Sequence, residues 1–184
     1  MIKIGDIVDG RYRLIDEIGR GGYGTVYRAH QVSMNRDVAV KLIHSHLAHA
    51  SGVIPRFIRE ARLAARLSHP HILVCYDFGQ FQDRLYLVTE YVPGQSLSHL
   101  LKEKGGMDEW TVCHIGMQIC SALEAAHEQN VIHRDLKPSN ILLTRRAGDK
   151  SFVKVIDFGL ARIINEHPRG ATDELTASDV LIGT

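Results

Sequence analysis

The hydrophobic pattern of this chain changes at residues 92–95, and that change limits the available folds more than any other feature. Before it, short apolar and β-branched runs, several of them ended by glycine, predict strands at residues 12–18, 25–30 and 37–43. After it, apolar residues at helical spacing follow a candidate N-cap, Asp108. The pattern therefore predicts an α+β chain, β-rich in its first half and mainly helical in its second.

Each part contains further predicted elements. The first part contains one main helix over residues 57–67, then strands over 73–78 and 85–91. In the second part short apolar strands are expected at 131–132, 141–143 and 152–156, and the sequence is polar and aperiodic from residue 163 to 178. The apolar stripe of the long helix comprises five residues: Val112, Ile115, Ile119, Leu123 and Ala126.

Composition excludes several classes of protein. The chain has 184 residues, 45% of them hydrophobic, with 22 Lys+Arg against 21 Asp+Glu, so global disorder is excluded. This balance gives no basis for nonspecific nucleic-acid binding, and any phosphate must be bound by a local site. Cys75, Cys113 and Cys120 lie in apolar segments without CxxC spacing, which predicts buried free thiols in a reducing compartment.

The sequence also bears on location. No apolar run approaches the roughly 18 residues that would cross a bilayer, and the first residues do not resemble a signal peptide. These features predict a cytoplasmic protein with no membrane segment.

A glycine-rich segment separates the first two predicted strands and fits the pattern G-x-G-x-x-G-x-V. Glycines allow a strand–turn–strand backbone to approach phosphate oxygens and to present N–H donors. An ordinary glycine-rich hairpin remains an alternative, but a strand rather than a helix follows, which disfavours a dinucleotide-binding fold. The residues of the segment are Gly19, Arg20, Gly21, Gly22, Tyr23, Gly24, Thr25 and Val26.

One lysine, Lys41, ends the apolar run Val-Ala-Val-Lys in a predicted strand. A buried ammonium group is costly unless it is paired. The candidate partner is Glu60, on the predicted helix of the first part. The alternative is an exposed lysine at the end of a strand.

Residues 133–140, with the sequence HRDLKPSN, contain the densest set of reactive groups. Asp135 could orient a hydroxyl, Lys137 could neutralise phosphate, and Asn140 could bind a hard cation. Asp157, in the sequence Asp-Phe-Gly, adds a second oxygen ligand at the end of a predicted strand. A solvated charged turn would explain this segment alone, but it does not explain four such segments in this order.

On these segments the chain resembles a eukaryotic-like serine/threonine protein kinase of the bacterial type, over residues 12–184. The lysine at 137 favours that class over tyrosine kinases and small-molecule phosphotransferases. The resemblance implies a protein-kinase-like two-lobed fold, with the N-lobe in residues 1–92 and a partial C-lobe in residues 93–184. Because the family domain is longer, we expect a catalytic domain truncated after its activation loop.

The resemblance also implies a role for each motif residue. Asp135 would be the catalytic base and Lys137 would contact the γ-phosphate. Lys41, tied to Glu60, would hold the α- and β-phosphates. ATP would be contacted by Gly19, Arg20, Gly21, Gly22, Tyr23, Gly24, Val26, Ala39, Lys41, Thr89, Glu90, Val92, Ser96 and Leu142.

Asn140 and Asp157 would bind Mg²⁺, the implied cofactor besides ATP. The resemblance further implies a hydrophobic stack behind the site, in which two members are smaller than expected and predict loose packing. That stack consists of Ala64, Cys75, His133 and Phe158.

The expected function is transfer of the γ-phosphoryl group of MgATP to protein Ser/Thr hydroxyls in signal transduction, with a dimer as a further expectation for autophosphorylation. The alternative is an ATP-binding but catalytically silent fragment that acts as an interaction module. Arg134 would grip an activation-loop phosphate, for which Thr176 and Ser178 are the candidate sites. A metal site at His44, His46 and His49 is disfavoured against a solvated loop.

Overall fold

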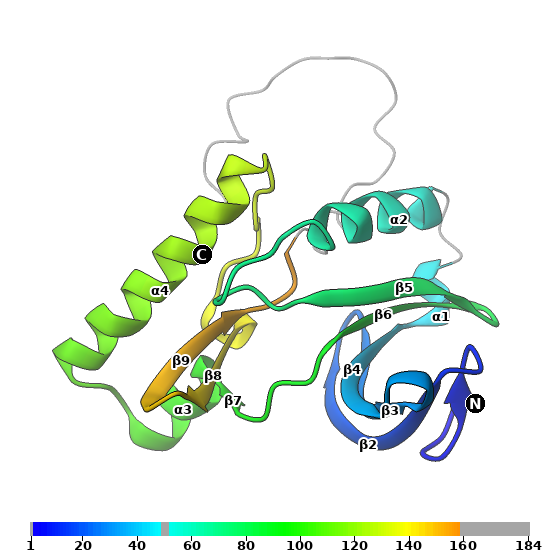
Figure 1. Cartoon of the computed structure of the whole chain (residues 1–184), viewed down its shortest axis with the longest axis horizontal. Helices are drawn as coiled ribbons and strands as arrows, with labels where there is room; N and C mark the ends of the chain where they lie inside the picture. Colours follow the sequence, from blue (N-terminus) through cyan, green and yellow to red (C-terminus); the bar gives the residue numbers. More distant parts are fainter. Residues whose placement is uncertain (1, 49–51, 159–184) are drawn as a thin grey trace.

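The computed structural model describes residues 2–48 and 52–158 (Figure 1). Within them the first part of the chain forms a six-stranded antiparallel sheet in the order β1-β2-β3-β4-β6-β5. Its strands are β1 Ile7–Val8, β2 Tyr12–Gly21, β3 Gly24–Gln31, β4 Arg36–Ile43, β5 Cys75–Phe81 and β6 Arg84–Glu90. The β-rich first part is therefore confirmed.

The second part of the chain forms a three-stranded sheet in the order β7-β8-β9 and the longer helices. Its strands are β7 Gln95–Ser96, β8 Ile141–Arg146 and β9 Asp149–Val155. The helices of the described residues are α1 Ser45–Ala48, α2 Val53–Ala64, α3 Leu97–Lys104 and α4 Glu109–Glu128, with 3-10 turns η1 Val32–Met34 and η2 Pro138–Asn140. The first part thus contains the short α1 besides the expected helix.

The two faces of the six-stranded sheet have different surroundings. Side chains alternate along a strand, so Val38, Val40 and Leu42 of β4 point to one face, where they pack with Tyr12, Tyr86 and their neighbours. On the opposite face Phe57 and Ala61 of α2 pack against Ile43, Leu85 and Leu87. Figure 1 shows α2 running alongside β5. Ala39 and Lys41 belong to this second face.

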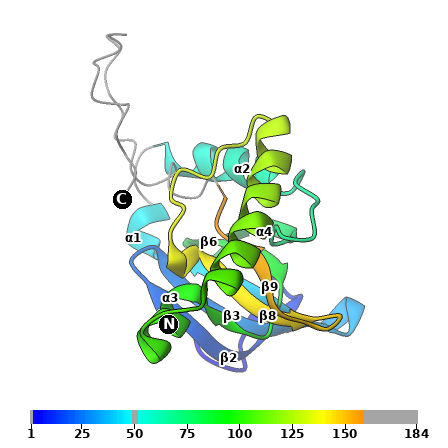
Figure 2. The ribbon, with the colours of Figure 1, turned by 90° about the vertical axis from the view of Figure 1, so that its left-hand side faces the viewer.

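Helix α4 packs against the β8–β9 hairpin (Figures 1 and 2). The side chain of Asp108 accepts a hydrogen bond from the Thr111 backbone N–H (2.9 Å), which confirms it as N-cap. The buried core of this part includes Ile115, Ala122 and Ala126 with Ile141, Leu143, Val153 and Val155.

One member of the predicted stripe was assigned wrongly. Val112 is 51% exposed, because it lies at the edge of the stripe in the first turn of α4. Gln118 is buried instead. Its Oε1 accepts from the Val153 N–H (2.9 Å) and its Nε2 donates to the Ser151 carbonyl (3.1 Å), so its polar atoms are satisfied against β9.

Two other predictions also fail. Cys113 and Cys120 are free but exposed, since they lie on the side of α4 away from Ile115 and Ala122, and Cys75 is only half-buried. Residues 131–132 lie in irregular backbone rather than in a strand.

Among the described helices, none is long and apolar enough to cross a membrane.

Candidate active site

Strand register gathers four of the predicted ATP-contacting residues on one face of the large sheet. In antiparallel pairs, directly opposed residues share a face. Val26 lies opposite Lys41, and Ala39 lies opposite Thr89. Ala39 and Lys41 are two residues apart on β4, so all four side chains lie on the same face. This is the face that α2 covers only in part.

The glycine-rich segment forms the β2–β3 hairpin, in which Gly21 pairs with Gly24. A Cβ on Gly24 would lie 2.2 Å from the Leu42 carbonyl oxygen, so the packing of the sheet itself requires glycine there. A Cβ on Gly21 or Gly22 would have nothing within 4 Å. Glycine at these two positions is therefore not a requirement of the described fold.

A histidine outside the predicted ATP set contacts this hairpin. The His44 Nε2 lies 3.1 Å from the Gly21 carbonyl oxygen, and the His44 backbone N–H donates to the Tyr23 carbonyl (3.0 Å). The His44 and His46 rings are stacked with centroids 5.6 Å apart. His49 lies outside the described residues, and those residues hold no cluster of three His, Cys, Asp or Glu suited to a metal ion.

The ion pair of Lys41 differs from the prediction. Its Nζ lies 2.7 Å from Oδ2 of Asp157, and no ion pair joins Lys41 to Glu60 within residues 2–48 and 52–158. Asp157 has a left-handed backbone (φ 61°), and its carboxylate meets the ammonium of Lys41 across the site. Glu60 is buried on α2. The sequence alone could not show which acidic residue pairs with Lys41, because Glu60 and Asp157 are both distant from it in the chain.

Asp135 lies in a short polar cluster. The Lys137 Nζ is 2.8 Å from its Oδ2, and the Asn140 Nδ2 donates to its backbone carbonyl (2.8 Å) and to Oδ2 (3.2 Å). Burial acts to raise the pKa of Asp135, but the hydrogen bonds and charge of these neighbours outweigh it, and the net pKa lies below its usual value. Asp135 is therefore an anion at neutral pH.

His133 connects this cluster to the segment that carries Asp157. The residue is 2% exposed. Its Nδ1 accepts from the Asp135 backbone N–H (3.3 Å), while Nε2 donates to the Ile156 carbonyl (2.8 Å). Burial lowers the pKa of His133, so the ring is neutral, with its proton on Nε2. The His133 and Phe158 ring centroids are 4.6 Å apart. The sequence motif identified His133 but not this linking role.

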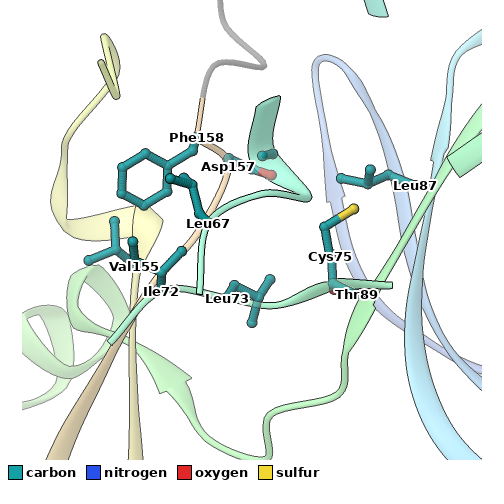
Figure 3. Close-up of a pocket in the computed structure, with 10 residues that line it drawn as sticks. Leu67, Ile72, Leu73, Cys75, Leu87, Thr89, Val155, Asp157 and Phe158 are labelled. Atoms are coloured by element: carbon teal, nitrogen blue, oxygen red, sulfur yellow. The ribbon is translucent and has the colours of Figure 1, made fainter. Parts of the chain in front are cut away.

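Behind Thr89 lies a pocket next to Asp157 (Figure 3). Three members of the predicted stack, Ala64, Cys75 and Phe158, line it, which accords with loose packing around small side chains. Burial raises the pKa of the Cys75 thiol to about 11, so the thiol is protonated at neutral pH. The pocket is lined by Ala64, Leu67, Ile72, Leu73, Cys75, Leu87, Thr89, Val155, Asp157 and Phe158.

The remaining predicted contacts lie around the connection from β6 to α3. Val92 is half-buried in the loop after β6. Leu142 is half-buried opposite Ser96, on the face of β8 away from buried Ile141 and Leu143. The Ser96 side chain accepts from the His99 N–H (3.1 Å) and caps α3, a role that the sequence prediction missed. Thr176 and Ser178 lie outside the described residues.

Comparison with known families then decides the family. The profile described as "Protein kinase domain" matches residues 12–181. The chain belongs to the protein kinase family. The resemblance identified from the motifs is thereby confirmed.

Similar proteins are bacterial serine/threonine kinases. The chain is 40% identical to "Serine/threonine-protein kinase pkn3" of Myxococcus xanthus, covering 98% of this chain and 33% of that protein. It is 38% identical to "Serine/threonine-protein kinase PrkC" of Bacillus subtilis, covering 88% of this chain and 24% of that protein. The chain thus spans only a quarter to a third of these relatives.

The fold is that of solved protein kinase domains. The crystal structure of the Mycobacterium tuberculosis PknI kinase domain matches with a TM-score of 0.76 at 29% identity, covering 86% of this chain and 62% of that chain. The two-lobed kinase fold with a partial second lobe, predicted from the sequence, is therefore confirmed.

Proposed function

We propose that this chain is the nucleotide-binding and catalytic part of a serine/threonine protein kinase, with lobes at residues 1–92 and 93–184. One observation carries the proposal. Asp135, Lys137 and Asn140 form one hydrogen-bonded cluster, which His133 links to the segment carrying Asp157. Phosphoryl transfer needs a carboxylate near the acceptor hydroxyl and cationic groups near the phosphates, held rigidly together.

In the proposed transfer a Ser or Thr hydroxyl oxygen bonds to the γ-phosphorus of ATP. The bond from that phosphorus to the β–γ bridging oxygen breaks, and its electron pair stays on ADP. The hydroxyl proton passes to the carboxylate of Asp135. Because the pKa of Asp135 is low, its main contribution is to orient the hydroxyl, and the proton moves late.

Lys137 has two roles in this scheme. Its ammonium lies 2.8 Å from the Asp135 carboxylate, and the hydrogen bond and charge of Asp135 raise the pKa of Lys137. The lysine therefore stays cationic near the reacting phosphate. It also fixes the carboxylate that receives the proton, so positioning and charge stabilisation come from the same group.

The residues present suit Mg²⁺. Asp157 provides carboxylate oxygens, and Asn140 donates from Nδ2 to Asp135, which directs its Oδ1 away from that contact. Mg²⁺ typically takes one or two such protein oxygens and completes its shell with water and phosphate. When bound, it would offset phosphate charge. In this scheme Lys41 exchanges its ion pair with Asp157 for contacts to the α- and β-phosphates.

The glycine hairpin offers a test of nucleotide binding. We expect Gly21→Ala to leave stability nearly unchanged, because a Cβ there meets no neighbour, but to weaken MgATP binding by about tenfold. Gly24→Ala is expected to cost about 2 kcal/mol of stability, because the methyl group would overlap the Leu42 carbonyl. Thermal unfolding and calorimetric titration measure both effects. Equal MgATP affinity in parent and Gly21→Ala would contradict the proposed role of the hairpin.

Activation by phosphorylation is a second part of the proposal. Arg134 is exposed, has a left-handed backbone (φ 68°) and immediately precedes Asp135. A phosphate at Thr176 or Ser178 would give its guanidinium charge-assisted hydrogen bonds. We expect a Thr176→Ala/Ser178→Ala double variant of the full-length protein to phosphorylate substrate at least tenfold more slowly than the parent.

The parent should carry phosphate at one of the two positions after incubation with MgATP, as read by mass spectrometry. Arg134→Ala is expected to lose the same activation. A double variant that is as fast as the parent would rule out the switch.

The chemical class of the phosphoryl acceptor distinguishes this proposal from the two alternative functions. A catalytically silent interaction module would bind MgATP without transfer, and a small-molecule phosphotransferase would label a sugar or antibiotic but not protein. We expect the full-length protein to label a generic basic protein on Ser or Thr. Labelling of small hydroxylic compounds alone would overturn the assignment.

The proposal also includes a cytoplasmic location, which the free thiols favour, and a dimer that phosphorylates itself.

A further inference from the structure

A buried lysine, Lys154, lies in β9 between two fully buried valines and belongs to none of the catalytic motifs. It is 5% exposed. Its Nζ donates to Oε1 of Glu90 (2.6 Å) and to the carbonyl of Ile72 (3.1 Å). A buried ammonium is tolerated only when paired and hydrogen-bonded, and Lys154 meets both conditions through groups from two other segments.

The partner, Glu90, ends β6 and is one of the residues expected to contact ATP. The resemblance to protein kinases implies that its backbone carbonyl accepts a hydrogen bond from adenine. Its Oε1 also accepts from the Val74 N–H (2.9 Å), and its own N–H donates to the Val74 carbonyl (2.9 Å). Both the backbone and the side chain of Glu90 are therefore fixed to the loop before β5. Lys154 supplies the positive charge next to this half-buried carboxylate.

The same loop is fixed to β9. The Val155 N–H donates to the His71 carbonyl (2.8 Å), and the Leu73 N–H donates to the Val155 carbonyl (3.0 Å). Lys154 thus sits where β9, the loop 71–74 and the end of β6 meet. It also lies opposite Leu142 in the β8–β9 register, and three residues before Asp157. The resemblance to protein kinases implies that Leu142 forms the floor of the adenine pocket.

We propose that Lys154 is a positioning residue for the nucleotide: through its ion pair with Glu90 it holds the adenine-binding backbone at a fixed distance from β9 and Asp157. This inference rests on the proposed function. If the cation is lost, the half-buried Glu90 carboxylate has no counter-charge and is expected to turn toward water. That movement would release the Val74 hydrogen bond and shift the Glu90 carbonyl.

The test compares Lys154→Met with Lys150→Met, the same change at an exposed position of β9. By calorimetry, at a temperature where each variant is folded, Lys154→Met is expected to bind adenosine about tenfold more weakly than the parent, and Lys150→Met equally well. In the full-length enzyme we expect KM for ATP to rise about tenfold while kcat stays within about twofold. A purely structural role would instead lower kcat at constant KM, because fewer molecules are folded.

A second substitution strengthens the test. The double variant Lys154→Met/Glu90→Gln carries no charge at either position, so no unpaired charge remains. The amide oxygen at position 90 can still accept from the Val74 N–H, and most of the adenosine affinity is therefore expected to return. If Lys154→Met does not fold, Lys154→Gln takes its place with the same expected loss, since its amide can still donate to Ile72.

Two results would overturn the inference: a folded Lys154 variant that binds adenosine like the parent, or a double variant as weak as the single one. A parent chain that binds neither adenosine nor MgATP would instead refute the proposed function itself.

Discussion

Asp135→Asn should slow phosphoryl transfer by at least about 100-fold while leaving MgATP affinity within about threefold of the parent. The amide has nearly the same shape and can accept from Lys137 through its oxygen, but it cannot take the proton of the acceptor hydroxyl. Loss of such a group lowers turnover by about 10²–10⁴-fold. Asp135 meets the proposed metal ligand Asn140 at its Nδ2 and not at the oxygen that would bind the cation, so the substitution should lower kcat and change nucleotide binding little.

The measurement is initial rate and nucleotide affinity on the same full-length preparation. Asp83→Asn, the same change in the exposed β5–β6 turn, is the matched control and should leave both quantities unchanged. An Asp135→Asn protein that loses affinity in proportion to its rate would remove Asp135 from the catalytic role.

Asp157→Ala should weaken MgATP binding by about 100-fold while adenosine binding changes by less than about threefold. The proposed contribution of Asp157 acts through the cation, which offsets phosphate charge and has no contact with the base. Asp157→Ala also removes the ion pair with Lys41. Without Asp157, the Lys41 ammonium is no longer held at 2.7 Å by a carboxylate and can bind phosphate directly.

Metal-free ATP should therefore bind Asp157→Ala at least as tightly as it binds the parent. Calorimetry with adenosine, ATP in chelator and MgATP gives the three affinities, and Asp157→Asn tests whether the charge or the oxygen ligand matters. Parallel losses for all three ligands would indicate a damaged site instead of a lost metal ligand.

The sequence predicted the elements that carry strong local patterns. The strands of the glycine hairpin, the lysine strand β4 and the Asp108-capped α4 follow from alternation, helical spacing and an N-cap, all of which are local. The hydrogen-bonded cluster of Asp135, Lys137 and Asn140 was predictable as a group, because the three residues lie within six positions of one another.

The two ion pairs that were missed join distant segments. Lys41 pairs with Asp157, 116 positions away, and Lys154 pairs with Glu90, 64 positions away. The apolar residues around Lys154 predicted a strand there, but nothing in the local sequence indicated that Lys154 pairs with Glu90. Likewise, apolar neighbours suggested that Cys113 and Cys120 are buried, although only one face of α4 packs on β9.

The most direct measurement follows labelled γ-phosphate from MgATP to a basic protein substrate with the full-length protein, its Asp135→Asn variant and its Asp83→Asn control. We expect label on Ser or Thr with the parent and the control, and a rate lower by at least about 100-fold with Asp135→Asn. Nucleotide binding without any transfer by the parent, or transfer by Asp135→Asn at a rate within about tenfold of the parent, would contradict this assignment.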